Sequence, residues 1–383
     1  MRGALVGMAM VALALPSSAM ASNGWHRSFA PPGDATSIDS IATVPGAGIM
    51  AAGGDSTGTS YDTPTVWQRT GHTWTAEPIP ADLTNGWGYL SGISGSSDGQ
   101  AWVVGRTVAL ATGAGTPLVG HWDGTAWSGV SEPWTQASNT NSGDLTTVSA
   151  RPGDVWVGGV EDPDVDHEPL GTPLLWHDDG GQWTQVPLEL ARTNCPFRHE
   201  IWVTAVSATS QGVFVAFNCE TADSGRAGAV EFFNGRSWHT VLRLGEGRQV
   251  FGLSQVPGDS TTVWAVGGVP MPDGFDRGAA WTGDSHKLHR VHGLPPLGRV
   301  VLEGVASDGN QVYLVGDDLT NTTGSVALRQ TAAGWEQLPG AGDRELQAVT
   351  IAPSGRAWVA RPEFGGWLGN QPPDSGVWTR APG

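Results

Sequence analysis

The sequence predicts an all-β fold, a seven-bladed β-propeller with four antiparallel strands in each blade. Two observations support this prediction directly: a unit of about 51 residues recurs seven times, and each unit contains four short apolar segments separated by turn residues. A third observation is negative, because no segment shows the 3.6-residue apolar periodicity of an amphipathic helix. A sandwich of two sheets would not require so regular a four-strand repeat.

The first strand of each unit is marked by two apolar residues three positions apart. A cluster of Gly, Pro, Asp or Ser residues, which tight turns require, follows every pair. The average spacing of the pairs lies in the range of propeller blades. The seven pairs are Ile38 and Ile41, Leu90 and Ile93, Leu145 and Val148, Val203 and Val206, Val250 and Leu253, Leu302 and Val305, and Leu346 and Val349.

The other three strands are clearest in the second unit. Residues 101–105 (AWVVG) are apolar on both faces of the alternation, as a sheet stacked between two neighbouring sheets requires. A loop then leads to a third strand at residues 118–122, and a short turn at residues 123–125 leads to a fourth strand at residues 126–130. The same order recurs along the chain, so we expect one blade per unit.

The mature chain is predicted to be a single propeller domain over residues 22–383. The predicted blades lie roughly at residues 36–80, 88–131, 143–188, 201–244, 249–293, 300–339 and 344–381.

The last unit lacks a fourth strand, and the N-terminal region supplies a candidate. Residues 24–29 (GWHRSF) are similar to the fourth strand of another unit, residues 237–241 (SWHTV). We therefore expect residues 24–29 to complete the seventh blade and close the ring, which removes an exposed sheet edge. In the alternative, residues 24–29 stay outside the ring and residues 377–381 serve as the fourth strand.

Residues 1–21 have the layout of a secretory signal peptide. Arg2 precedes an apolar run at residues 4–15, and small residues lead to a cleavage site at Ala19-Met20-Ala21. The run is shorter than the roughly 20 residues that a transmembrane helix needs. We therefore predict a secreted, extracellular protein without membrane insertion, and we expect a monomer.

The formal net charge is −17 and the chain has two cysteines. The acidic balance argues against nucleic acid or anionic lipid as partners and is compatible with divalent cations, neutral sugars or basic proteins. It could equally serve only to keep an exported protein soluble. In an oxidising compartment, Cys195 and Cys219 most simply form one disulfide, which leaves no thiol for catalysis.

The unit resembles the kelch repeat and the central propeller of the galactose-oxidase class. The shared features are a Gly-Gly pair that closes the second strand and a Trp in the fourth strand. They occur as Gly53-Gly54 with Trp74, Gly158-Gly159 with Trp183, and Gly267-Gly268 without its Trp. The units are also similar to repeats of exported actinobacterial proteins. The galactose-oxidase resemblance would imply a copper enzyme with Tyr and His ligands and a Tyr–Cys cross-link. This chain has three tyrosines, and its two cysteines are expected to pair with each other, so that catalytic motif does not carry over.

Residues 96–102 (SSDGQAW) are loosely similar to the Asp-box of sialidases. The segment falls between the first and second strands of its unit, whereas the Asp-box turn lies between the third and fourth, and it is one residue short. We interpret it as an ordinary turn.

Strands alternate in direction within a blade, so the connections divide between two faces of the propeller. The turns between strands one and two and between strands three and four are short, and we call their side the short-turn face. The connections between strands two and three and between blades are longer, and we call their side the long-loop face. Because long loops on a rigid scaffold usually carry sites, we expect function on the long-loop face.

Three tryptophans outside the repeat pattern fall in loops of the long-loop face: Trp87, Trp134 and Trp367. An exposed indole can hold a sugar ring or an apolar partner surface. Alternatively, these side chains pack under their own loops.

Residues 161–168 form an acidic loop on the same face. Asp162, Asp164 and Asp166 alternate along it and could offer oxygen atoms to Ca²⁺, which prefers six to eight such ligands. The glycine and the distal Glu of an EF-hand are missing, so a solvated acidic loop is the alternative. We expect no other cofactor.

Two further groups could carry chemistry. Asp164, Asp166 and His167, together with His199 and Glu200 in another loop of the long-loop face, could form a general acid–base set in a hydrolase. The axis of the ring is the second place, because some first-strand residues must point toward it. The polar first-strand residues are Asp39, Glu303 and Gln347.

The sequence therefore favours a secreted binding module that recognises carbohydrate or a protein surface through the long-loop face. The alternative is a secreted, glycan-directed hydrolase or lyase, and a third reading is a structural propeller that needs a partner chain. The hydrolase predicts carboxylates with strongly perturbed pKa values gathered in one pocket. The binding module predicts exposed indoles in a shallow groove instead.

Overall fold

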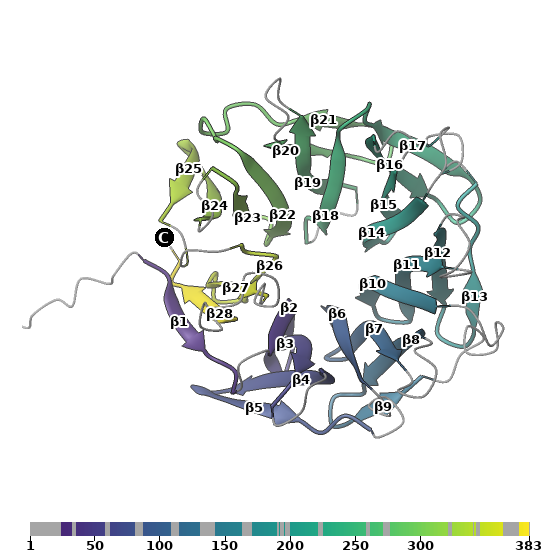
Figure 1. The fold of residues 1–383 in the computed structure, drawn as a ribbon, viewed down its shortest axis with the longest axis vertical. Coiled ribbons are helices and arrows are strands. Elements are labelled where there is room, and N and C mark those ends of the chain that lie inside the picture. Colours follow the sequence, from purple (N-terminus) through teal and green to yellow (C-terminus); the bar gives the residue numbers. More distant parts are fainter. Residues whose placement is uncertain are drawn as a thin grey trace, which may run out of the picture.

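The protein is an all-β propeller in which seven four-stranded antiparallel sheets surround a central axis (Figure 1), as the sequence predicts. The computed structural model describes residues 24–32, 36–57, 62–80, 87–108, 115–130, 142–162, 171–189, 191, 195, 200–220, 225–257, 261–270, 276–320, 324–339, 341, 345–362 and 375–382. The predicted signal peptide lies outside them and stays a prediction. No helix in the described ranges is long and apolar enough to cross a membrane.

Strands follow chain order from the axis to the rim in blades 1 to 6. Blade 1 is β2 (Ser37–Val44), β3 (Gly48–Asp55), β4 (Thr63–Thr70) and β5 (Thr73–Glu77); blade 2 is β6 (Trp87–Gly95), β7 (Ala101–Val108), β8 (Gly115–Trp122) and β9 (Trp127–Gly129); blade 3 is β10 (Ser142–Arg151), β11 (Asp154–Asp162), β12 (Thr172–Asp178) and β13 (Trp183–Gln185).

The second half of the ring repeats this order until the last blade. Blade 4 is β14 (Glu200–Thr209), β15 (Gly212–Glu220), β16 (Arg226–Phe233) and β17 (Trp238–Arg243); blade 5 is β18 (Gln249–Gln255), β19 (Val263–Pro270), β20 (Asp276–Gly283) and β21 (Leu288–Arg290); blade 6 is β22 (Val300–Ser307), β23 (Val312–Asp318), β24 (Gly324–Thr331) and β25 (Gly334–Leu338); blade 7 is β26 (Ala348–Ile351), β27 (Ala357–Arg361), β28 (Gly376–Arg380) and β1 (His26–Phe29).

Apolar clusters fill the wedges between neighbouring blades. Between blades 2 and 3, for example, Trp102, Val104, Leu145 and Trp183 are buried together. Each second strand is apolar on both faces because both faces meet a neighbouring blade. This arrangement explains why most tryptophans recur at fixed positions of the unit: a large ring fills the widening gap between radiating sheets.

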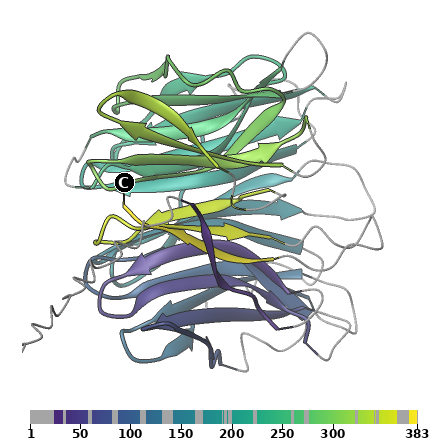
Figure 2. The same cartoon turned by 90° about the vertical axis from the view of Figure 1, so that its left-hand side faces the viewer.

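The N-terminal strand closes the ring, as predicted, and the alternative with a free N-terminal segment is wrong. β28 takes the third position of blade 7, and β1 pairs with it antiparallel, with Arg27 opposite Trp378. Figure 2 shows the first and last strands of the chain side by side. The outer edge of β28 is thereby covered by a strand from the other end of the chain.

Aromatic and polar contacts fix β1 in place. The ring of Phe29 stacks on Trp74 of blade 1, with 5.1 Å between centroids, and the indole nitrogen of Trp74 donates to Ser28 Oγ at 3.1 Å. On the other side, Arg27 Nη2 donates to the carbonyl of Ser375 at 2.8 Å, and its guanidinium lies 5.3 Å from the ring centroid of Trp378. β1 therefore connects blade 7 to blade 1.

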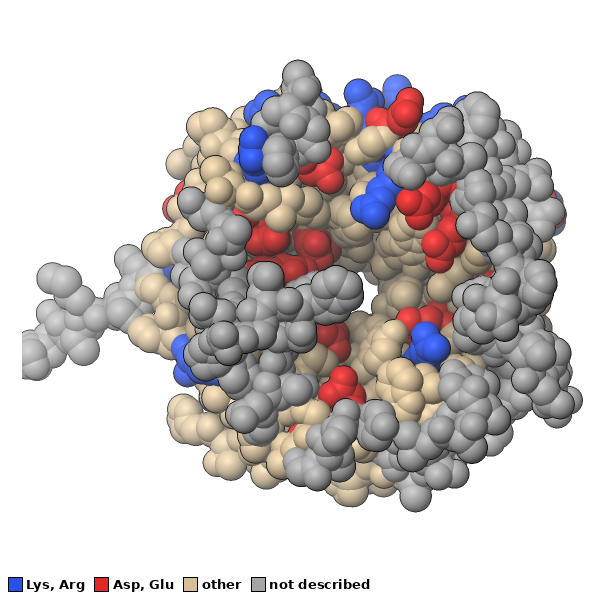
Figure 3. Space-filling view, viewed as in Figure 1, with Lys and Arg blue, Asp and Glu red and all other residues tan. Residues whose placement is uncertain are grey.

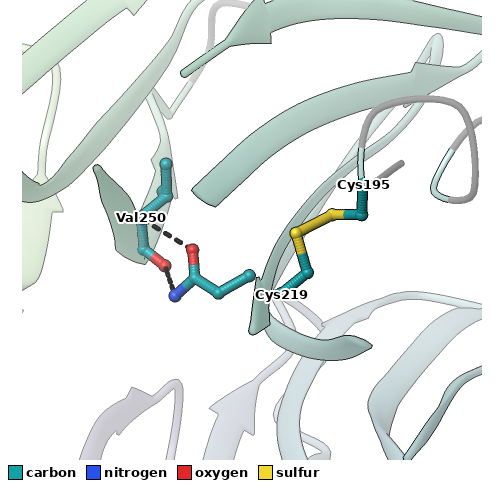
Figure 4. The surroundings of a disulfide bond; sticks show 4 residues. Cys195, Cys219 and Val250 are labelled. Atoms are coloured by element: carbon teal, nitrogen blue, oxygen red, sulfur yellow. Dashed lines mark hydrogen bonds between the residues drawn. A yellow bond between two sulfur atoms is a disulfide. The ribbon is translucent and has the colours of Figure 1, made fainter. Parts of the chain in front are cut away.

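Cys195 and Cys219 form the predicted disulfide, which joins the connection before blade 4 to β15 (Figure 4). Both cysteines are buried. The neighbouring Asn218 is fully buried and forms two hydrogen bonds with the backbone of Val250 in blade 5, each of 2.9 Å. Its amide thus substitutes for a missing backbone partner between two blades.

Candidate functional site

Several residues that the sequence singles out lie outside the described residues. These are Trp134, Trp367, Asp164, Asp166, His167 and His199. Their roles as indole platforms or as an acid–base set therefore stay predictions.

Three of the predicted site residues are strand ends on the long-loop face. Trp87 is the first residue of β6, opposite Val108, and not part of the preceding loop. Glu200 is the first residue of β14, and Asp162 is the last residue of β11. Trp87 and Glu200 are half-buried. The described residues contain no group of three or more His, Cys, Asp or Glu side chains arranged to hold a metal ion.

Acidic side chains gather around the central opening of the ring (Figure 3). They come from the ends of strands on the long-loop face, where the first strands of the blades converge on the axis. Seven residues are connected by hydrogen bonds or mutual electrostatic influence, and we call them the axial arc. They are Asp39, Asp62, Tyr89, Asp144, Glu303, Asp317 and Glu345.

Asp39 of β2 is the central member of the axial arc. Its Oδ2 accepts a hydrogen bond from Ser37 Oγ at 2.9 Å. Burial among the first strands raises the pKa of Asp39 to about 7, and the nearby charges of Asp62 and Glu345 raise it further against the effect of the Ser37 hydrogen bond. The side chain can therefore exchange a proton close to neutral pH.

Glu303 of β22 and Glu345 before β26 form a carboxyl pair across blades 6 and 7. Burial raises the pKa of both groups, and their mutual hydrogen bond requires that one of them keeps a proton. Asp317, at the end of β23, adds further repulsion. This end of the axial arc thus holds a shared proton.

Tyr89 of β6 and Asp144 of β10 form the other end of the axial arc. The Tyr89 hydroxyl donates to Asp144 Oδ2 at 2.7 Å. Burial raises the pKa of Asp144, while Tyr89 and the charge of Arg106 act in the opposite direction. Asp144 Oδ1 and Arg106 Nε are buried and have no hydrogen-bond partner among the described residues. A ligand could supply both missing partners.

The sequence indicates only part of this site. Asp39 and Glu303 stand out because each follows the first apolar residue of its strand, a position that faces the axis. Glu345, Asp62 and Asp317 lie at strand ends or just outside strands, where the repeat pattern gives no direction to a side chain.

The titration of Asp39 predicts a pH dependence of stability. Folding raises the pKa of Asp39, so the folded state favours the protonated carboxyl group. The contribution of Asp39 to the free energy of unfolding is therefore full below about pH 4 and is lost as the pH rises to about 7. The free energy of unfolding of the unmodified protein should fall as the pH rises over this range. We expect the slope of this fall to be smaller in Asp39→Asn, by less than about 1.4 kcal/mol per pH unit. Urea denaturation at several pH values measures this.

Asp123→Asn provides a contrast of opposite sign. Hydrogen bonds from the Thr125 hydroxyl and from the amides of Thr125 and Ala126 lower the pKa of Asp123. The stabilisation from Asp123 is present at neutral pH and is lost on acidification, so this variant should lose stability mainly at neutral pH. Equal pH profiles for Asp39→Asn and the unmodified protein would contradict the assignment.

No family model and no curated protein matches this sequence. Among solved structures, YCF48 bound to a D1 peptide is 14% identical, with a TM-score of 0.52, covering 94% of this chain and 96% of that one. The Hadza microbial sialidase Hz136 is 10% identical, with a TM-score of 0.53, covering 84% and 73%. The chain shares their propeller fold.

A third similar structure is a mutant α-L-arabinofuranosidase from Fusarium graminearum in complex with an iminosugar inhibitor. It is 10% identical, with a TM-score of 0.51, and the match covers 80% of this chain and 95% of that one. At such identities the three similarities show the fold and not the activity.

Proposed function

We propose that this protein is an extracellular binding propeller that recognises carbohydrate at the central opening of its long-loop face. The observation that carries the proposal is the axial arc, in which carboxyl and phenol groups from five blades lie close enough to shift one another's pKa. Acidic side chains also gather around the central opening of this face (Figure 3). Because several of these groups titrate near or above neutral pH, the site offers both hydrogen-bond donors and acceptors. Sugar hydroxyl groups need both.

The charge of the site narrows the class of ligand. Among the described residues, the charge of Arg106 acts on Tyr89 and Asp144, and the axial arc holds six carboxyl groups. Even with one proton shared by the Glu303–Glu345 pair the arc stays negative, so an acidic sugar or peptide would be repelled. A neutral or amino sugar would meet no such barrier. The concave opening also favours the end of a glycan chain over a flat protein surface.

Trp87 supports the same proposal. It lies two residues before Tyr89 in β6, so both side chains leave the strand on the same side. Trp87 is half-buried and stands at the long-loop end of its strand. An indole beside hydrogen-bonding groups is suited to the apolar face of a sugar ring.

A glycan-array screen of the mature protein tests this proposal. We expect saturable binding to a neutral or amino-sugar glycan, weakened about tenfold by Asp39→Asn and by Trp87→Ala. Glu246→Gln changes an exposed carboxylate outside the axial arc and should bind normally. Failure to bind any glycan would refute the proposal. A parallel screen with EDTA tests the Ca²⁺ prediction for Asp162, Asp164 and Asp166.

A glycoside hydrolase is the second candidate, and the Glu303–Glu345 pair favours it. Acid–base hydrolysis needs one protonated and one ionised carboxyl group in a single site, and a shared proton with raised pKa values meets part of this requirement. Glu303→Gln should then abolish release of reducing sugar while leaving binding in place. Binding without any release by the unmodified protein would exclude this candidate.

A further inference from the structure

A groove on the short-turn face, opposite the axial arc, lies between blades 2 and 3. Its volume is about 500 Å³, within the range of about 300–1,000 Å³ for small-molecule pockets. The groove is lined by residues from the turns and adjoining strand ends of both blades. It shares no residue with the axial arc, so the two places can be tested separately.

One wall of the groove is aromatic. The ring of His121 stacks on Trp102 with 4.2 Å between centroids, and Trp183 meets Trp102 edge-on at 5.8 Å. His121 Nε2 lies 2.7 Å from Gln100 Oε1. Burial lowers the pKa of His121, so the ring is neutral at neutral pH and this wall carries no charge.

The stacked pair alone is not a sign of a ligand, because blade 3 repeats it. Trp156 stacks on His177 with 4.0 Å between centroids, and His177 Nε2 lies 3.0 Å from Asp154 Oδ1. The pair thus belongs to the packing of the repeat. Other residues must distinguish the groove between blades 2 and 3.

Ser96 provides that distinction. The residue is only 2% exposed and lines the groove, and its hydroxyl has no hydrogen-bond partner among the described residues. Its backbone is satisfied, because the Ser96 amide donates to the Gln100 carbonyl at 2.8 Å and the Ser96 carbonyl accepts from Gly99. A buried hydroxyl without a partner costs about 1–3 kcal/mol, so a ligand that bonds to it would gain affinity.

The rim of the groove carries one charge of each sign. Arg151 is about one-third exposed, and its Nη1 lies 3.8 Å from Asp154 Oδ2. The Asp178 carboxylate accepts hydrogen bonds from the backbone amides of Gly180 and Gly181. Because Arg151 is already paired with Asp154, the charge of Asp178 is not offset, and the rim disfavours an anion. Both residues can bond to hydroxyl groups.

Three exposed glycines, Gly153, Gly180 and Gly181, line the edge of the groove. Gly153 and Gly180 have φ angles of +64° and +91°, which other residues rarely adopt. A Cβ atom on Gly180 would lie 3.6 Å from the carbonyl oxygen of Gly153, whereas a Cβ on Gly181 would meet nothing within 4 Å. A longer side chain at Gly181 should therefore project without a clash and obstruct the groove.

We propose that the groove between blades 2 and 3 is a second ligand site, which takes a neutral, hydroxyl-rich molecule such as one saccharide unit. The Ser96 hydroxyl, the Gln100 amide and the Asp178 carboxylate bond to hydroxyl groups, and the negative rim excludes anions. The aromatic wall contacts the apolar edge of the sugar ring. This site does not depend on the function proposed for the axial arc.

Saturation-transfer NMR of the full mature protein with a panel of neutral monosaccharides and disaccharides tests the proposal. We expect at least one sugar to bind, and Ser96→Ala and Gly181→Gln each to weaken it about fivefold to tenfold. Ser96→Ala removes an unsatisfied hydroxyl, so its thermal midpoint should not fall. This separates loss of binding from loss of folding.

Glu246→Gln alters an exposed carboxylate outside both sites, so it is the matched control and should leave binding in the groove unchanged. Asp39→Asn identifies any sugar that binds at the axial arc instead, because only such a sugar should lose affinity in this variant. The proposal is overturned if no neutral sugar binds, or if no bound sugar loses affinity in both groove variants while keeping its affinity in Asp39→Asn. A preference for glucuronate over every neutral sugar at this groove would also overturn it. If every bound sugar loses affinity in Asp39→Asn alone, the sugars bind at the axial arc and the second site is refuted.

Discussion

A chain shortened to begin at Ala30 should lose about 5 kcal/mol of its free energy of unfolding. The shortened chain lacks β1, so it forfeits the burial of Phe29 and the hydrogen bonds of the β1–β28 pairing. It also exposes the edge of β28, which invites aggregation. Urea denaturation followed by tryptophan fluorescence measures the loss, and light scattering reports the aggregation.

Three further measurements test whether the loss comes from β1 itself. Phe29→Ala should cost about 2 kcal/mol, because the half-buried ring packs between blades 7 and 1. His26→Ala alters an exposed side chain of the same strand and should cost much less. A synthetic peptide of residues 24–32 should restore part of the stability of the shortened chain. Unchanged unfolding without β1 would mean that closure contributes nothing.

Replacing both Cys195 and Cys219 by Ala should lower the free energy of unfolding by about 3 kcal/mol. The disulfide closes a loop with a sequence separation of 24 residues, and such a cross-link restricts the unfolded chain by roughly this amount. Because both cysteines are buried, the lost side-chain packing adds to the cost. Chemical denaturation of the purified variant measures the loss.

A reductant supplies the control for this prediction. Dithiothreitol should destabilise the unmodified protein and leave the double alanine variant unchanged. If the variant and the unmodified protein unfold at the same urea concentration, the cross-link is not a determinant of stability. We expect the destabilisation to centre on blade 4, since Cys219 is the last residue but one of β15.

The fold could be predicted because each of its determinants is local or repeated. The paired apolar residues of the first strands recur in every unit, so one correct interpretation extends to seven blades. Closure by β1 follows from counting strands, since the last unit lacks a fourth strand and the N-terminal region contains a strand that belongs to no other unit. The disulfide follows from the presence of two cysteines and an expected oxidising compartment.

The axial arc could be predicted only in part, because it depends on relations between blades. Tyr89 and Asp144 are 55 positions apart, and their contact depends on how two neighbouring first strands are offset. The sequence also placed Trp87 in a loop. In the structure β6 begins three residues before its first apolar marker, Leu90, because the ladder with β7 extends to Val108.

The groove between blades 2 and 3 illustrates the same limit. The sequence indicates an ordinary turn at residues 96–102, and the structure has a turn there that ends where β7 begins at Ala101. Its hydroxyl and amide side chains become significant only beside Arg151 and Asp178, which a neighbouring blade provides. A single repeat carries no information about which side chains of the next repeat face it.

The pairing of β1 with β28 has a consequence for biosynthesis. The ribosome makes Arg27 early and Ser375 some 348 residues later, yet the two are bonded in the finished fold. Until β28 has been made, β1 at the N-terminal end of the nascent chain has no strand to pair with, and the ring of blades is incomplete. We expect the ring to assemble only after the C-terminal residues are made, so a chaperone that shields the leading strand would raise the yield of folded protein.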